Sequence, residues 1–237
     1  GFDAGLTWIK NRTDAGSSHL FTDSSRGADK RLRTDTSDLE DGTYGLTDYT
    51  SDGFTVQNSS NQNSSGKNYV SWSWLVNGGT TSSNTSGTIT STVQTNSTAG
   101  ISIGTYTGNG SNGATVGHGL GSVPDWIIIK NRNSNSTDWA VWPKAYNSGG
   151  TNAARINTTA AFGGSNGAGF FNDTAPTSTL ITLGTRGEVN SNTDGHIFYA
   201  FKSIVGFSKF GTYTGNGSTD GTFIYTGFKP GFLIVKK

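Results

Sequence analysis

The sequence contains no cysteine, which excludes disulfide bonds and thiolate metal sites. Methionine is also absent, including at position 1, so we expect that the chain begins by processing or is a piece of a longer protein. Its 4 prolines are too few for a proline-rich stalk. No apolar run approaches the length of a membrane span, and no signal peptide is visible at the start. We therefore expect no membrane insertion.

Charge is scarce as well. Charged residues make up 14% of the chain and the formal net charge is +1, with Lys and Arg scattered along the sequence. This distribution argues against nucleic-acid binding. Hydrophobic residues reach only 31%, but the low charge and an aromatic share of 11% distinguish the chain from a disordered one. Its polarity comes from Gly, Ser, Thr and Asn, which favour turns and strand surfaces.

One eight-residue segment occurs twice. The sequence Gly-Thr-Tyr-Thr-Gly-Asn-Gly-Ser stands at 104–111 and again at 211–218, an offset of 107 residues. Each copy leads to a short apolar run, at 124–130 and at 230–236, and residues 1–10 are similar to that run. Self-similarity at a fixed period indicates a repeat architecture, here with a unit of about 105 residues.

The later half of the unit repeats too, because residues 54–74 match residues 181–201 at a constant offset of 127. We therefore divide the chain into four parts. They are a partial unit that lacks its opening strands (1–76), a Gly/Ser/Thr/Asn-rich linker or leading strand (77–100), a complete unit (101–203) and the opening strands of a further unit (204–237).

The incomplete units have a geometric consequence. A sheet that lacks its opening strands exposes an edge on which another strand can pair. We expect residues 204–237 to complete the 1–76 half-unit or to join a neighbouring chain. The alternative, compatible with both, is that the chain is a window on a longer array of repeats.

The apolar pattern is that of strands. Apolar and polar residues alternate with a period of two at 70–74, and the run 126–129 is short and apolar throughout, as in a strand buried on both faces. Asn-Gly pairs at 109–110, 112–113 and 216–217 are typical of hairpin turns. No segment shows helical periodicity. We predict an all-β fold of tandem β-sandwich units, jelly-roll or lectin-like, with a small barrel as the alternative.

Several longer motifs follow one another in a fixed order. They include Tyr-Thr-Gly-Asn-Gly (106–110), His-Gly-Leu-Gly (118–121), Ile-Ile-Lys-Asn-Arg (128–132), Gly-Phe-Ser-Lys-Phe-Gly (206–211) and Tyr-Val-Ser-Trp-Ser-Trp (69–74). Together they resemble a repeat family found in tail-fibre-like structural proteins of tailed phages from marine and freshwater bacteria. The resemblance covers nearly the whole chain. One departure is Ser73, where that family often has cysteine.

The resemblance implies a non-enzymatic structural protein on the virion surface, and we expect a tail fibre or other appendage. The polar composition and near-zero net charge suit a contribution to attachment to host-surface glycans. It implies no catalytic residue and no cofactor. The partners would be other virion proteins and copies of the chain itself in a homo-oligomer, with a trimer among the candidates. Repeated units would multiply a weak contact. The alternative is a carbohydrate-binding module of a larger adhesin or enzyme, and a glycan depolymerase is a third hypothesis.

The residues that could carry chemistry form no convincing site. The densest acidic stretch holds four carboxylates, Asp35, Asp38, Glu40 and Asp41. A solvated loop is our interpretation of it, with a calcium site as the alternative. The three histidines lie far apart, so we predict no metal site. Asp23 and Arg26 could pair across a turn, as local structure rather than as a site.

Exposed aromatic rings can stack on sugars. The candidates for glycan binding are Trp142, Tyr106 and Tyr213. Trp142 has the opposite phase to its strand neighbour Trp139, and the two tyrosines adjoin a turn. Four other tryptophans fall on apolar faces that recur within the chain and are assigned to the core: Trp72, Trp74, Trp126 and Trp139.

Overall fold

The computed structural model of the chain describes residues 1–146, 151–161 and 167–236. Within these ranges the fold is all-β, as predicted, and its strand ladders are antiparallel. The strands are β1 (Ala4–Asn11), β2 (Leu20–Asp23), β3 (Leu46–Thr50), β4 (Gly53–Val56), β5 (Tyr69–Leu75), β6 (Ser82–Asn84), β7 (Ser91–Asn96), β8 (Ile101–Thr107), β9 (Ala114–Gly117), β10 (Trp126–Asn131), β11 (Ala140–Pro143), β12 (Ala154–Arg155), β13 (Leu180–Leu183) and β14 (Gly195–Phe201). The helices are α1 (Gly167–Phe171) and α2 (Gly187–Asn190).

A three-stranded sheet forms from the N-terminal residues in the order β2-β1-β5. Alternation places large rings on one face, where Trp8 lies opposite Phe21 on one neighbouring strand and Trp72 on the other. The other face carries Ile9 and Leu20, which the β3–β4 hairpin covers with a small core. Among the described residues no strand pairs with the outer edge of β5.

A seven-stranded sheet follows in the order β12-β11-β10-β14-β8-β7-β6. Ile127, Ile129 and Trp142 point from it into a core that α1, α2 and the two-stranded β9–β13 sheet complete. Ile128 and Tyr199 point to the opposite face. The isoleucine run of β10 is therefore buried on both faces, as its sequence predicts.

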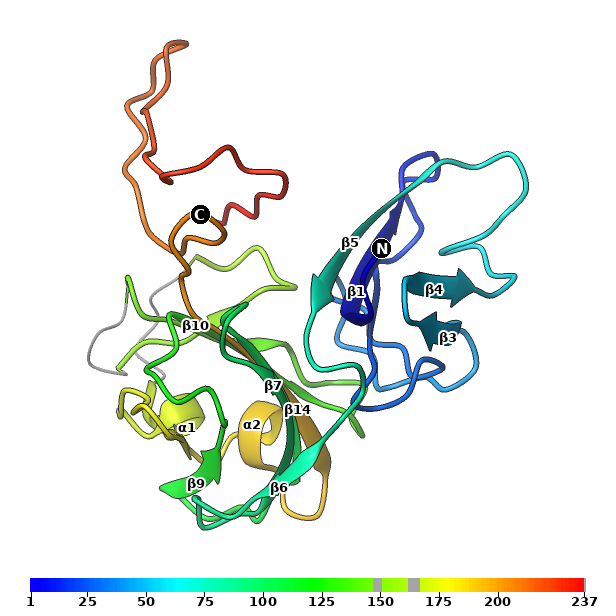
Figure 1. Ribbon diagram of the computed structural model, residues 1–237. Coiled ribbons are helices and arrows are strands. Elements are labelled where there is room, and N and C mark those ends of the chain that lie inside the picture. Colours follow the sequence, from blue (N-terminus) through cyan, green and yellow to red (C-terminus); the bar gives the residue numbers. More distant parts are fainter. Residues whose placement is uncertain (147–150, 162–166, 237) are drawn as a thin grey trace.

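The two sheets pack face to face. The ring of Phe21 in the small sheet lies 4.8 Å from the ring of Tyr199 and 5.9 Å from that of Trp139 in the other layer. Figure 1 shows the layers in order, from the β3–β4 hairpin through β1 and β5 to the large sheet and its helices. Each large side chain buried in this layer stabilises the fold by about 1.5–3 kcal/mol.

The internal repeat reappears in the strand register. Trp8 on β1 lies opposite Trp72 on β5, and Ile128 on β10 lies opposite Tyr199 on β14. These pairs are related by the sequence offsets of 120 and 127. The β1–β2 and β10–β11 ladders correspond in the same way. Strands β2, β1 and β5 thus correspond to β11, β10 and β14, and the corresponding faces meet in the shared core.

The Asn-Gly pairs form turns, but not hairpins. The φ angle is +70° at Gly110, +78° at Gly113 and +68° at Gly217, a left-handed conformation that glycine adopts without strain. The first two turns connect β8 to β9, which belong to different sheets. The predicted hairpins are therefore wrong there, because the turns carry the chain from one layer to the next.

The two short helices were not visible in the sequence. Helices α1 and α2 have only five and four residues, too few to leave a periodic apolar pattern. Neither approaches the length and apolarity that a membrane-crossing helix requires in the described part of the chain. Within the polar stretch 77–100, β6 and β7 pair with each other and extend the large sheet beyond β8.

The C-terminal segment, residues 204–236, forms no strand ladder in the described chain, although the sequence predicts opening strands there. An isolated bridge joins Ile204 and Ser208, and the segment then projects away from the rest of the fold before it turns back (Figure 1). Phe223 is 86% exposed and Tyr225 77%. A strand must satisfy its backbone groups on a neighbour, and none of the strands in the described residues pairs with this segment to supply them.

Candidate functional site

The structure buries two of the three aromatic residues expected to bind glycans. Trp142 is 1% exposed and Tyr106 5%, so the expected exposure of both rings is wrong. Trp142 points away from Trp139, as its phase predicts, but into the second core beneath α1 and β13. Sequence alternation showed the direction of this side chain but not the layer that covers it. Tyr213 is 49% exposed and remains a candidate.

Most carboxylates of the acidic stretch form ion pairs with arginines and are not free to bind a cation. Arg33 Nη1 donates to Asp38 at 2.8 Å, Arg31 forms an ion pair with Asp41, and Asp35 accepts the backbone N–H of His19. An open depression of about 640 Å³ lies beside these residues. Since Asp38, Glu40 and Asp41, the carboxylates that line this depression, already have arginine partners, the depression offers neither a free acid pair nor an empty set of calcium ligands in the described residues.

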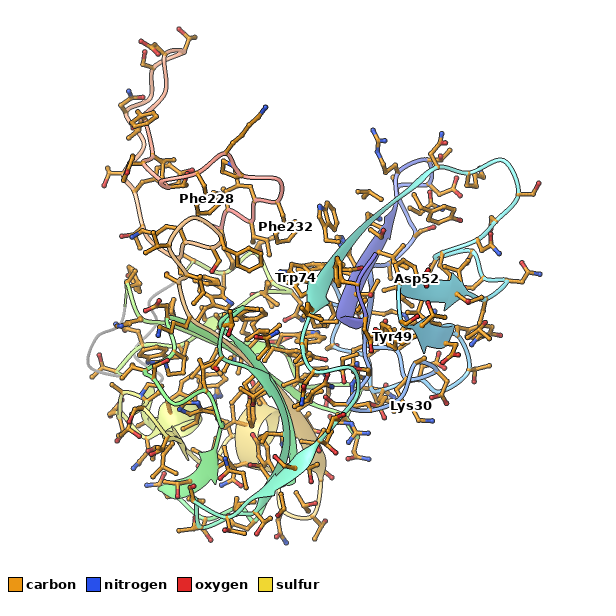
Figure 2. The ribbon with its side chains drawn as sticks, in the orientation of Figure 1. Lys30, Tyr49, Asp52, Trp74, Phe228 and Phe232 are labelled. Atoms are coloured by element: carbon orange, nitrogen blue, oxygen red, sulfur yellow. The ribbon has the colours of Figure 1, made fainter. Side chains whose placement is uncertain are left out.

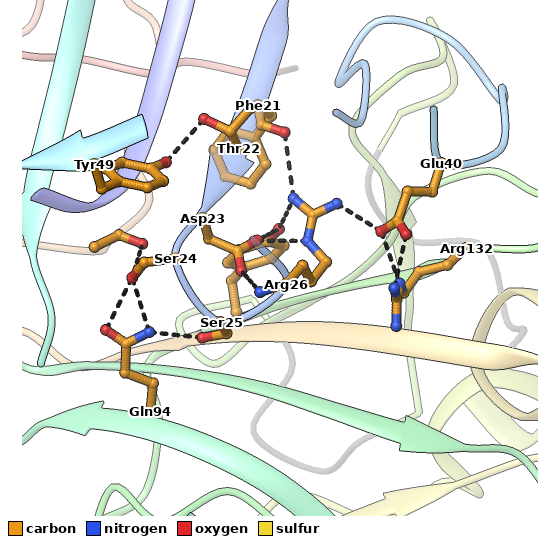
Figure 3. A network of polar contacts seen from close by, with 12 residues as sticks. Phe21, Thr22, Asp23, Ser24, Ser25, Arg26, Glu40, Tyr49, Gln94 and Arg132 are labelled. Carbon is orange, nitrogen blue, oxygen red and sulfur yellow. Dashed lines mark hydrogen bonds and ion pairs between the residues drawn. The ribbon is translucent and has the colours of Figure 1, made fainter. Parts of the chain in front are cut away.

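The fourth carboxylate of this stretch, Glu40, crosses to the other layer. Arg132, which directly follows β10, donates to both of its oxygens, at 2.8 Å from Nε and 2.7 Å from Nη2. Arg26 Nη1 donates to the same carboxylate at 2.8 Å. Figure 3 shows Glu40 between the two guanidinium groups. The interpretation of this stretch as a solvated loop therefore fails at Glu40, which joins the two halves of the molecule.

Arg26 and Asp23 form the buried centre of the network. Arg26 Nε donates to Asp23 at 2.7 Å across the turn after β2, so the expected local pair is confirmed. Both side chains are fully buried. The Tyr199 hydroxyl donates to the same carboxylate at 2.7 Å from the large sheet. A buried charge is tolerated only when it is paired and hydrogen-bonded, and here one acid and one base satisfy each other beside the aromatic core.

The pKa shifts follow from this geometry. Burial alone would lower the pKa of Arg26, but Asp23, Tyr199 and Glu40 together raise it. Burial alone would raise the pKa of Glu40, but Arg132 and Arg26 lower it. Burial raises the pKa of Tyr199. These directions favour the charged forms of Arg26 and Glu40 and the neutral form of the Tyr199 hydroxyl.

Two more polar side chains tie the layers together. Gln94 on β7 is fully buried, and its Nε2 donates to the Ser24 and Ser25 hydroxyls at 3.0 and 2.8 Å. Lys130 on β10 donates to the backbone oxygens of Ser37 at 2.9 Å and Thr137 at 2.6 Å. Burial lowers the pKa of Lys130 to about 8. Both side chains bridge the halves of the chain.

The histidines have structural roles. Burial lowers the pKa of His118 and His196. The His118 ring contacts the backbone oxygen of Thr177, and the His196 ring contacts that of Gly187. His19 accepts the indole N–H of Trp8 at 2.8 Å. In the residues that the structure covers, no three His, Asp or Glu side chains gather closely enough to hold a metal ion.

A partly buried aromatic cluster lies where the C-terminal segment returns to the small sheet. The Phe232 ring lies 4.9 Å from Trp72, 5.4 Å from Trp74 and 5.9 Å from Trp8. Figure 2 shows Phe232 turned toward Trp74. Trp72 and Trp74 are half-buried in the shared core, in line with their assignment. The C-terminal segment therefore contacts the half-unit through side chains, without adding a strand to it.

Sequence reasoning found the Asp23–Arg26 pair but missed its partners. Tyr199 is 176 residues from Asp23, and Arg132 is 92 residues from Glu40. No local spacing connects residues so far apart, and only the packing of one repeat on the other brings them together. What the network can do is fix two sheets in one relative position.

A family described as a domain of unknown function, DUF7483, matches residues 1–237 of the chain. No curated protein and no solved structure shows a significant match.

Proposed function

We propose that this chain, which belongs to the DUF7483 family, is a non-catalytic structural building block of an extended surface appendage, such as a phage tail fibre. The observation that carries the proposal is the packing of two repeat-related sheets through a buried layer closed by paired charges. A protein that must transmit position along its length needs units that cannot rotate against each other.

In this proposal the chain is read as tandem β-sandwich units. The small sheet and its hairpin form the body of one unit, and the large sheet with its covering layer forms the next. Residues 204–236 begin a third, because 211–218 repeats 104–111. Repeat proteins gain stability from such contacts between neighbouring units.

The appendage would also contribute to attachment, with host-surface glycans and other virion proteins as partners. A polar, nearly neutral surface suits neutral glycans, and many copies convert a weak contact into firm attachment. Tyr213 supports this part of the proposal, because its half-exposed ring can stack on a sugar. The same observation favours the alternative function, a carbohydrate-binding module of a larger adhesin or enzyme.

The assembly state tests the structural proposal. The purified 237-residue chain should form elongated homo-oligomers whose size grows with concentration in sedimentation velocity, and negative-stain electron microscopy should show them as rods. A chain that stays monomeric up to millimolar concentration would refute the proposal. Glycan-array binding that Tyr213→Ala abolishes, in a monomeric chain, would favour the carbohydrate-binding module instead.

A further inference from the structure

The open depression of about 640 Å³ beside the acidic stretch is built by both repeats. Arg33 and residues 38–43 of the first repeat form most of its lining, and Asn135 of the second repeat completes it. Its volume lies within the range of about 300–1,000 Å³ that is typical of small-molecule sites. The depression is therefore complete only where the two repeats pack against each other.

The loop that forms most of this lining is held at both ends. Ser37 Oγ donates to the backbone oxygen of Asn135 at 3.0 Å, and the Leu39 N–H donates to Asn135 Oδ1 at 3.0 Å. At the other end, the backbone N–H of Thr43 donates to Asp41 Oδ1 at 2.7 Å. Because these bonds fix the lining before any ligand arrives, they reduce the entropy that binding would cost.

The charges of the depression cancel in pairs. Arg33 Nη1 pairs with Asp38 at 2.8 Å, and Arg31 pairs with Asp41. Glu40 lies between two guanidinium groups (Figure 3). A charged ligand would have to displace one of these partners, whereas a neutral ligand leaves every pair in place. The depression therefore discriminates against charged ligands and suits a neutral one.

Three polar groups of the lining keep hydrogen-bonding capacity. Asp38 Oδ2 accepts the bond from Arg33, but no donor of the described chain reaches Asp38 Oδ1. Asn135 Oδ1 holds the loop, but Asn135 Nδ2 donates to no oxygen within the residues that the structure covers. The Thr43 side chain is exposed. An acceptor, a donor and a hydroxyl on one lining match sugar hydroxyl groups, each of which both donates and accepts.

We propose that this depression binds a short neutral saccharide of a surface glycan, with Asp38 Oδ1 accepting from one hydroxyl and Asn135 Nδ2 donating to another. Leu39 lines the depression and is 37% exposed, and Tyr44, which follows Thr43 in the chain, is 47% exposed. These side chains supply the apolar surface on which the C–H face of a sugar ring packs.

The inference rests on the proposed function and deepens it, because it adds a glycan site at the joint between the repeats to the exposed ring of Tyr213. Every copy of the chain in an assembly would present one such site. Many copies of a weak site give firm attachment when they engage one surface together.

A printed array of neutral hexose and N-acetylhexosamine oligosaccharides tests the site, with sialylated and sulfated oligosaccharides as charged probes. Asp38→Asn removes the acceptor charge, and Asn135→Asp removes the donor but keeps the oxygen that holds the loop. The matched controls are Asp14→Asn, in a surface ion pair elsewhere, and Asn58→Asp, an exposed amide outside the depression. Tryptophan fluorescence checks that each variant is folded.

We expect the native chain to bind neutral oligosaccharides, both depression variants to lose about tenfold or more in apparent affinity, and both controls to retain it. Neutral-glycan binding that Tyr213→Ala abolishes and both depression variants retain would overturn the inference but leave the attachment function standing. A preference for the charged probes would also overturn it. A native chain that binds no oligosaccharide would refute both the inference and the attachment function, while the assembly test still decides the structural part.

Discussion

The charge at the centre of the interface is open to a direct test by Asp23→Asn. The Asp23 carboxylate accepts three hydrogen bonds, from Arg26 Nε at 2.7 Å, from the Arg26 backbone N–H at 3.1 Å and from the Tyr199 hydroxyl at 2.7 Å. All of its side chain is buried, as is that of Arg26. An amide of the same shape keeps one acceptor oxygen but turns an N–H₂ group toward donors.

The expected cost follows from the charge left behind. Without Asp23, the buried Arg26 guanidinium keeps Glu40 as its anionic partner but loses the closer of its two carboxylates. Removing one partner of a buried ion pair costs about 3–5 kcal/mol. With a urea m-value of about 1–3 kcal/mol/M, the unfolding midpoint should fall by more than about 1 M.

The control is Asp29→Asn, the same substitution in a surface pair. Asp29 and Lys30 lie 2.8 Å apart, but their side chains are 49% and 37% exposed. Exposed pairs contribute about 0–1 kcal/mol, so this variant should unfold almost as the native chain does. Urea unfolding followed by tryptophan fluorescence measures both. If the two variants lose stability by amounts within about 1 kcal/mol of each other, the central role of Asp23 is refuted.

Three further predictions concern the fold. A Cβ on Gly104 would lie 2.1 Å from the Phe198 ring on β14, whereas a Cβ on Gly211 would meet nothing within 4 Å. In urea unfolding, Gly104→Ala should therefore lower the free energy of unfolding by about 1–3 kcal/mol, and Gly211→Ala should leave it almost unchanged. Burial lowers the pKa of Lys130 to about 8 against about 10.4 in the unfolded chain, so the unfolded chain binds more protons between these values. Stability should therefore rise from about pH 8 to 9.5, and Lys130→Met, whose side chain does not titrate, should remove that rise. Trp142→Ala should cost about 3–5 kcal/mol and Tyr213→Ala less than about 0.5 kcal/mol, and equal losses would contradict their assigned burial.

The strands were predictable because their signals are local. Alternation at 70–74 and the isoleucine run after Trp126 follow from the two-residue period of a strand, and both segments are strands in the structure. The repeat also predicted which strands correspond, because a constant offset between two copies in the sequence becomes the same register between their paired strands. The correspondence of β1 with β10 and of β5 with β14 follows from it.

Burial by a second layer was not predictable. The phase of Trp142 correctly set it opposite Trp139, but exposure depends on what lies above the strand. The covering pieces, α1 and β13, are five and four residues long and separated from β11 by more than twenty residues. The Asn-Gly turns misled for a related reason, because a turn sets a local change of direction but not which sheet receives the next strand.

By itself, the sequence determined the all-β class, the repeat and its register, and the local Asp23–Arg26 pair, since each depends on residues close together or on identity between copies. Tertiary structure alone decided that the matching faces of two repeats pack against each other, and that Glu40 and Tyr199 close a buried network with residues 92 and 176 positions away. The physical reason is that the hydrophobic effect is non-directional, so an apolar face does not specify which other apolar face it packs against. Many pairings would bury the same rings, and only the folded chain shows which one also pairs Arg26 with Asp23 and Glu40 with Arg132 at its border.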